Sequence, residues 1–213
     1  MSVAFFGWLA VVISTTMALP QLVRLVRTRN VEGVSLTAWK AILALNLAWA
    51  AHGIRIAEVP LIVTNVLAPL TTLPILYFVT RASGRRFVVN LLPSLALAAA
   101  AIGIDIMFGS AAFGVAGVCL AVVSNIGQSI ELIRSPHVRG VATLFMVLAV
   151  VNQGVWLVWA VLVADPGSTI SAANMGAMAA FNLLWYALRR LGLRAFFPHP
   201  TAGVELAVVA EAG

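Results

Sequence analysis

The sequence predicts an all-α membrane protein with seven transmembrane helices, arranged as two parallel three-helix repeats joined by a linker helix. Three observations support this fold class. Of the 213 residues, 62% are hydrophobic and only 9% are charged, which leaves too little polar surface for a water-soluble globule. Charge-free runs recur at close to the roughly 20 residues that a helix needs to cross a bilayer. The third observation is an internal duplication.

The duplication is visible when the sequence is shifted by 107 positions. Ten residues then fall on identical ones: Ala4, Phe6, Gly7, Gln21, Leu25, Arg27, Val31, Gly33, Val34 and Trp49 match Ala111, Phe113, Gly114, Gln128, Leu132, Arg134, Val138, Gly140, Val141 and Trp156. Matches among Ala, Leu and Val carry little weight in so apolar a chain. Matches of a Gln, an Arg, a Gly-Val pair and a Trp in one register are informative. Internal repeats of this kind are a signature of membrane transporters.

The runs between charges place the seven helices in order. They cover residues 3–23, 34–54, the segment between Glu58 and Arg81, 87–108, 112–133, 141–163 and 168–188. The second helix contains Lys40, about two turns from its start, which we expect to extend toward the membrane surface. The fourth carries Asp105 near its end. No acidic residue lies in the middle of an expected span.

These helices divide the chain into four parts. Residues 1–80 form the first repeat, 81–110 the linker helix, 111–194 the second repeat and 195–213 a cytoplasmic tail, which we expect to be disordered. Three spans reverse the direction of the chain, and the linker restores it. The two repeats are therefore expected to be parallel, related by an axis along the membrane normal.

The basic residues predict the orientation in a cell membrane. Eleven of the 13 follow the first, third, fifth and seventh helices: Arg24, Arg27, Arg29, Arg81, Arg85, Arg86, Arg134, Arg139, Arg189, Arg190 and Arg194. Because positive loops stay in the cytoplasm, the N-terminus is expected outside and the C-terminus inside. The net charge of +6 therefore reflects membrane topology, and no nucleic-acid partner is predicted.

Several motifs recur at the helix ends. The first helix ends in Pro20-Gln21, the second opens with Gly33-Val34-Ser35-Leu36, and Trp49 is followed by His52-Gly53. This pattern resembles the PQ-loop repeat of the SWEET and SemiSWEET sugar transporters, with His52 in place of the family's tyrosine. In the second repeat Gly127-Gln128 replaces Pro-Gln, while Trp156 and Asn174 are kept. The resemblance covers nearly the whole chain except the fourth helix and the tail.

The resemblance implies a substrate pocket between the repeats. Counting about 1.5 Å per residue, Asn65 and Asn174 lie roughly 10 Å from the outer ends of their helices, and Trp49 and Trp156 reach a similar depth. Amide groups suit sugar hydroxyls, and indole faces suit the C–H faces of a sugar. These four residues are the predicted substrate-binding set. Aromatic belts and interhelical amide contacts are the structural alternatives.

Three residues are hinge candidates and one is a candidate pocket wall. Pro20 removes a backbone hydrogen bond near the inner end of its helix, and Gln21 and Gln128 lie beside the expected bends. SWEET-type repeats carry further prolines, where this chain has Ala38, Gly127 and Phe145. His52 is expected either at the membrane interface or in the pocket wall.

The predicted function is facilitative transport of a small neutral solute, favouring a mono- or disaccharide, by alternating access between the repeats. The alternatives are a proton-linked transporter of amino acids or other small solutes, and a seven-helix receptor or scaffold that moves nothing. We predict neither enzymatic activity nor a cofactor or metal site, since no nucleophile has an evident base and the histidines are scattered. The expected partners are the solute and the lipid bilayer. A monomer is sufficient to form the pathway because one copy holds both repeats, and an oligomer stays open as an alternative.

Overall fold

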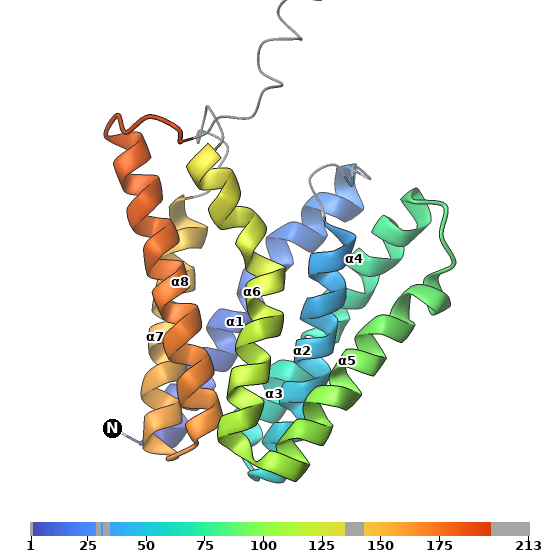
Figure 1. Ribbon diagram of the computed structural model, residues 1–213, viewed down its shortest axis with the longest axis vertical. Coiled ribbons are helices and arrows are strands. Elements are labelled where there is room, and N and C mark those ends of the chain that lie inside the picture. The colour runs from blue at the N-terminus through green and yellow to red at the C-terminus, as the bar shows by residue number, and fades with distance from the viewer. Residues whose placement is uncertain (1, 29–30, 32–34, 135–142, 197–213) are drawn as a thin grey trace, which may run out of the picture.

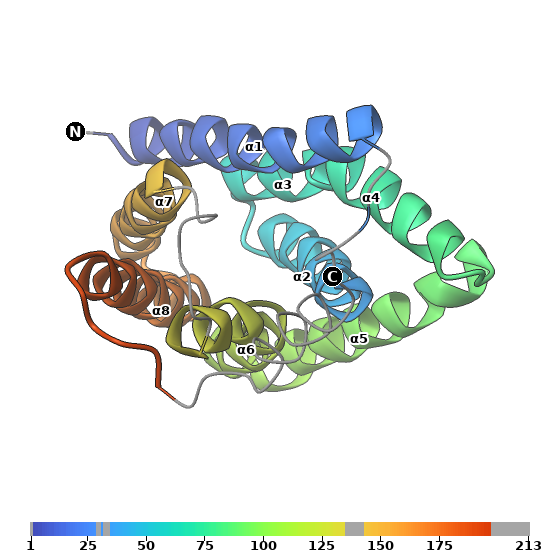
Figure 2. The ribbon, with the colours of Figure 1, turned by 90° about the horizontal axis from the view of Figure 1, so that it is seen from above.

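The computed structural model describes residues 2–28, 31, 35–134 and 143–196, and every regular element within these ranges is an α-helix (Figure 1). The elements are α1 (Val3–Thr28), α2 (Leu36–Arg55), α3 (Val59–Leu67), α4 (Pro69–Ala82), α5 (Phe87–Phe108), α6 (Ser110–Arg134), α7 (Thr143–Leu162) and α8 (Pro166–Arg190). Seen from above, the helices form a ring with α2 inside it (Figure 2). The all-α prediction is confirmed, and the tail expected at 195–213 lies almost entirely outside the described residues.

The expected third helix is divided into α3 and α4. Pro69 has no backbone N–H, so it cannot donate to the carbonyl four residues earlier, and the helix is interrupted at Ala68. The hydroxyls of Thr71 and Thr72 donate to the Ala68 carbonyl at 2.9 and 3.0 Å. The two helices still count as one apolar segment of membrane length, Val59–Ala82.

Several of the described helices are long and apolar enough to cross a membrane. Three qualify, namely Val59–Ala82, α5 and α7, and a fourth does if the bent α6 is one span. The apolar part of α1, Val3–Met17, is shorter, and α2 and α8 are not among the candidates. These helices indicate membrane association, but composition and length do not support the expected number of seven spans.

The 107-residue register is visible in the backbone. When the bounds of α2, residues 36–55, are shifted by 107 positions, they coincide with those of α7, residues 143–162. Ala57 and Ala164, also 107 positions apart, are the non-glycine residues with positive φ among those described, at 58° and 55°. Each precedes an acidic N-cap residue, Glu58 or Asp165, and a helix with proline in its first turn.

A close helix contact is repeated in the same register. A Cβ on Gly7 of α1 would lie 2.7 Å from the ring of Pro60 in α3, and a Cβ on Gly114 of α6 would lie 2.6 Å from the carbonyl oxygen of Gly167 in α8. Since real Cβ contacts are longer, glycine is what allows both helix pairs to approach.

The bundle has two ends, which we name by their residues. At the arginine end α1, α4, α6 and α8 finish with Arg27, Arg81, Arg134 and Arg189–Arg190. At the histidine end α2 finishes with His52 and Arg55, and α5 and α7 finish nearby. Figure 1 shows the arginine end at the top, where α6 and α8 stand apart from α2 and α4.

The buried cores differ between the two ends. At the arginine end, one cluster of Leu25, Ile75 and Val79 lies wholly in α1 and α4, and another of Leu132, Met146 and Tyr186 lies wholly in α6, α7 and α8. At the histidine end the clusters join the halves: Ala48 and Ala101 pack on Phe113, and Leu61 packs on Trp159 and Ala160. The halves therefore have separate cores at one end and a shared core at the other.

Candidate functional site

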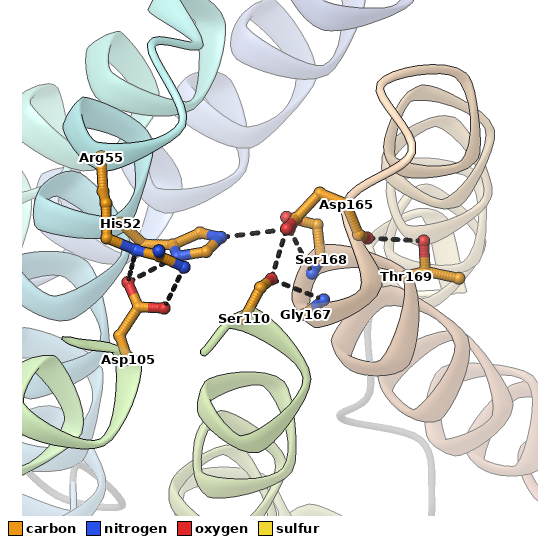
Figure 3. Close-up of polar contacts among 8 residues, drawn as sticks. All are labelled: His52, Arg55, Asp105, Ser110, Asp165, Gly167, Ser168 and Thr169. Atoms are coloured by element: carbon orange, nitrogen blue, oxygen red, sulfur yellow. Dashed lines mark hydrogen bonds and ion pairs between the residues drawn. The ribbon is translucent and has the colours of Figure 1, made fainter. Parts of the chain in front are cut away.

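An ionic cluster lies at the histidine end (Figure 3). His52, in the last turn of α2, is 0% exposed, and its two ring nitrogens face two carboxylates. Nδ1 lies 2.7 Å from Asp105 of α5, and Nε2 lies 3.1 Å from Asp165 in the link between α7 and α8. The imidazole therefore bridges the two halves of the molecule.

Asp105 is held by a second cation from α2. Arg55 donates from Nε and Nη2 to its two carboxylate oxygens at 2.8 and 2.6 Å, the bidentate geometry that makes guanidinium–carboxylate pairs strong. Gly109, with φ of 84°, ends α5 one turn later and its N–H donates to the Asp105 carbonyl. This abrupt turn lets α6 begin at Ser110, beside the cluster.

Asp165 is held by donors from the second half. As the N-cap of α8 it accepts from the N–H of Ser168 at 2.8 Å, and it also accepts from the hydroxyl of Ser110. The Ser110 hydroxyl in turn accepts from the N–H of Gly167 at 2.9 Å. Burial alone would raise the pKa of Asp165, but the hydrogen bonds from His52, Ser110 and Ser168 lower it well below its usual range.

The charges of the cluster balance when His52 is protonated. Carboxylate oxygens only accept, so a ring with a carboxylate at each nitrogen is fully hydrogen-bonded as the imidazolium, which donates twice. Two cations, His52 and Arg55, then face two anions, Asp105 and Asp165. Buried charges need such partners, and each of the three buried groups, His52, Asp105 and Asp165, has one, while Arg55 is 40% exposed.

Aromatic rings line the inner side of the cluster. Phe113 of α6 stacks on the imidazole of His52 with centroids 4.5 Å apart, and Trp49 meets Phe113 edge-on at 4.7 Å. One turn further along α6, a Cβ on Gly117 would lie 3.5 Å from the Trp49 indole. His52 is therefore buried between Phe113 and the two carboxylates, close to Trp49.

Two of the four predicted pocket residues pack against one apolar cluster. Trp49 of α2 and Trp156 of α7 both pack against Leu61, Trp159 and Ala160. Asn65 lies one turn beyond Leu61 on α3, is 9% exposed, and donates to the Leu61 carbonyl at 2.9 Å. The two tryptophans, one from each half, are therefore neighbours of a common core.

Trp156 also belongs to a polar group that the sequence did not indicate. Its Nε1–H donates to the hydroxyl of Ser14 in α1 at 3.0 Å, and Ser14 donates to Asn152 Oδ1 at 2.9 Å. Asn152 lies one turn before Trp156 on α7 and is 8% exposed. The chain of bonds crosses from the first half to the second.

Asn174, the fourth predicted pocket residue, does not correspond to Asn65 in the 107-residue register. It is exposed on α8 and donates to the Ile170 carbonyl at 2.9 Å. The 107-residue shift pairs Asn65 with the buried Ala172 and not with Asn174. Two positions turn a helix by about 200°, so the two asparagines do not occupy matched faces.

The hinge candidates lie within α1 and the bent helix α6. α1 runs through Pro20, whose side chain is exposed, and ends at Thr28. Gln21 and Gln128 lie in α1 and α6, and their side chains are outside the described part of the structure. Lys40 does not simply extend to the surface: its Nζ donates to Asn90 of α5 at 2.6 Å.

Within the ionic cluster, Ser110 and His52 do not form a nucleophile–base pair. Ser110 donates to Asp165, not to His52, so the imidazole is not placed to take a proton from the hydroxyl. Among the described residues, no group of three or more His, Cys, Asp and Glu side chains could hold a metal ion. What the cluster can do is join two parts of the bundle through one titratable ring.

Fold and site together define an all-helical, membrane-associated protein whose two parts meet at a buried ionic cluster. Comparison of the chain with protein-family models, with curated proteins and with solved structures finds no match.

Sequence reasoning missed most of this cluster. Asp105 and Asp165 lie 60 residues apart near expected helix ends, where an acidic residue is ordinary. A usable signal was the pairing of Glu58 with Asp165 in the repeat, since both cap a helix after a left-handed Ala. Nothing in the pattern placed His52 between the two aspartates, because their meeting depends on how three helices end.

Proposed function

We propose that the protein is a facilitative carrier of a small neutral solute, with a mono- or disaccharide as the favoured substrate. In this proposal all seven helical units, with α3 and α4 counted as one, cross the membrane as two parallel repeats joined by α5. The solute path lies between the repeats, and the resemblance to the PQ-loop sugar transporters supports this reading.

One observation carries the proposal: the halves share a core at the histidine end and have separate cores at the arginine end. A carrier that works by alternating access must close one end of its path while the other is free to part. The described structure fits the state that is closed at the histidine end. A rigid receptor has no need of this asymmetry.

The chemistry next to the shared core suits a sugar. Trp49 and Trp156 offer apolar ring faces and are both half-buried, and Asn65 and Asn152 supply amide groups nearby. Hydroxyl-rich solutes are bound by such pairs of ring faces and amides. Asn174 stays in the proposed set as an exposed amide of the second half.

The arginines support the orientation in this proposal. The ends of α1, α4, α6 and α8 carry them together, so the arginine end faces the cytoplasm by the positive-inside rule. The histidine end then faces outward. The path is closed at that end and open at the arginine end, toward the cytoplasm.

The test is solute counterflow in liposomes containing the purified protein. A panel of labelled mono- and disaccharides is offered to vesicles preloaded with the same unlabelled sugar, and we expect at least one to accumulate transiently. Trp49→Ala and Trp156→Ala should abolish counterflow, and Asn65→Ala and Asn174→Ala should reduce it. The matched control is Trp8→Ala, because Trp8 is 48% exposed on α1 and outside the shared core.

Each alternative gives a different outcome. Accumulation of amino acids driven by an imposed pH gradient would replace the sugar substrate with a proton-linked one. Saturable binding of a solute without counterflow would identify a receptor and overturn the carrier proposal. Unchanged counterflow in all four pocket variants would move the path away from the two tryptophans.

A further inference from the structure

The ionic cluster consists of two sets that are each complete without the other. Asp105 keeps a bidentate partner in Arg55, both on the α2–α5 side. Asp165 keeps Ser110 and the N–H of Ser168, all on the α6–α8 side. Among the described hydrogen bonds of the cluster, the two sets are joined only between His52 Nε2 and Asp165 at 3.1 Å.

That joining contact depends on one proton. A neutral imidazole has a single N–H, and the contact of Nδ1 with Asp105, at 2.7 Å, is the shorter of the two. When His52 loses one proton, Nδ1 keeps its N–H toward Asp105, and Nε2 then has only a lone pair facing the carboxylate of Asp165. The contact across the halves then changes from a charge-assisted hydrogen bond to a repulsion.

The charged neighbours of His52 come from three parts of the chain. Arg55 lies on its own helix, Asp105 on α5, and Asp165 in the link before α8. From α6 the ring meets Phe113, which is uncharged. Glu58 caps α3 next to α2, and no ion pair joins it to His52 among the described residues; burial raises the pKa of Glu58.

We propose that His52 is a proton-binding site that latches the histidine end: with the proton bound the two halves are held together, and release of the proton lets them part. The proposal rests on the carrier function above, since it makes opening of the proposed outer gate depend on pH. His52 is fully buried in the closed state, so its proton exchanges with the solution that the opened histidine end meets. The pH on that side is therefore the one that controls opening.

The test measures the distance across the joint without any solute. Spin labels are placed at Ile54→Cys on α2 and Leu162→Cys on α7, which are 64% and 46% exposed, in a Cys119→Ser background that removes the single native cysteine. The protein is held in nanodiscs while the pH is raised from about 5 to about 10, a range that includes ordinary histidine titration. We expect a longer-distance population to grow with pH, with at least a tenfold change in the ratio of open to closed forms, roughly the effect of one charge-assisted bond.

Two controls separate the latch from general pH effects. Labels at Ile54→Cys and Ile106→Cys lie on α2 and α5, on the same side of the joint, and their distance should not change with pH. Glu58→Gln should leave the transition in place, whereas His52→Gln, which cannot titrate, should remove it. If His52→Gln does not fold, the wild-type titration is followed by NMR of ¹⁵N-labelled histidine, and the His52 signal must change over the same pH interval as the distance.

A pH-independent distance in the wild type, or a transition that survives in His52→Gln, would overturn the latch. So would a His52 signal that titrates outside the pH interval of the opening. Failure of the carrier function gives a different pattern, because the distance then still changes with pH while no solute shows counterflow. A latch without transport and transport without a latch are thus separate results.

Discussion

The two ends of this bundle are built in opposite ways. At the arginine end, Leu25 and Leu132 occupy corresponding positions in two separate cores, one for each half. At the histidine end, Phe113 and Trp159 of the second half pack into the first, and His52 joins the ionic groups. The repeated leucines therefore serve each half by itself, whereas the ionic joint between the halves uses His52 and Asp165, whose register partners are Trp159 and Glu58.

The joint shows this most clearly. The register pairs His52 with Trp159, and both side chains are 0% exposed at the histidine end. The histidine forms ion pairs and the tryptophan packs in an apolar cluster, so equivalent places in the two repeats have different tasks. Four predictions test the contrast, from the largest expected effect to the smallest.

Asp165→Ala should have the largest effect, because it leaves the buried His52 without its partner across the halves. Breaking a buried ion pair costs about 3–5 kcal/mol of unfolding free energy. The register partner Glu58 makes no side-chain capping bond, so Glu58→Ala should cost within about 1 kcal/mol. Reversible unfolding in mixed micelles measures both, and equal losses would show that the joint is no more important than its counterpart.

Gly114→Ala should cost about 1–3 kcal/mol, since its Cβ would meet the backbone oxygen of Gly167, which cannot easily move. Gly7→Ala meets the Pro60 ring and should cost less. Gly154→Ala is the control, because nothing lies within 4 Å of its Cβ position, and alanine there should stabilise α7 by about 0.5–1 kcal/mol. Thermal unfolding ranks the three, and a stabilising Gly114→Ala would contradict the close approach.

A buried hydrogen bond distinguishes the second-half core at the arginine end. Ser129 donates to Asn182 at 2.8 Å, where the register places the apolar Leu22 and Ile75 in the first half. Ser129→Ala alone should cost about 1–3 kcal/mol, because it leaves a buried amide unpaired.

Adding Asn182→Leu to that variant should restore most of the loss, since both polar partners are then gone. A double-mutant cycle of unfolding free energies checks this. Additive losses would mean that the lost Ser129–Asn182 hydrogen bond does not explain the destabilisation by Ser129→Ala.

The smallest effect is in acid. Because its pKa is lowered on folding, Asp165 contributes stability that is fully present above the unfolded value, about pH 4, and is lost as the pH falls toward the folded value. The difference in melting temperature between wild type and Asp165→Asn should therefore be largest at about pH 5, where His52 is protonated, and shrink below about pH 4. If the difference in melting temperature grew as the pH fell, folding would raise the pKa of Asp165 and not lower it.

Much of the local structure could be predicted from the sequence. Apolar runs between charges placed the helices, except that the third divides into α3 and α4 at Pro69. Trp49 and Trp156, which the sequence assigned to one pocket, pack against one apolar cluster. Residue type and depth pair Asn174 with Asn65 in the sequence. In the repeat register, however, Asn174 lies two residues after the position that corresponds to Asn65, so the two side chains lie on different helix faces.

The sequence by itself determined helix, apolarity and repetition, because these follow from local periodicity and from side chains compared along the chain. Only the tertiary structure decided which end of the bundle is joined and by what. Asp105, Asp165 and His52 are ordinary residues near helix ends until α2, α5 and the α7–α8 link converge. A buried charge needs partners in three dimensions, and no spacing along one chain states which ones it will find.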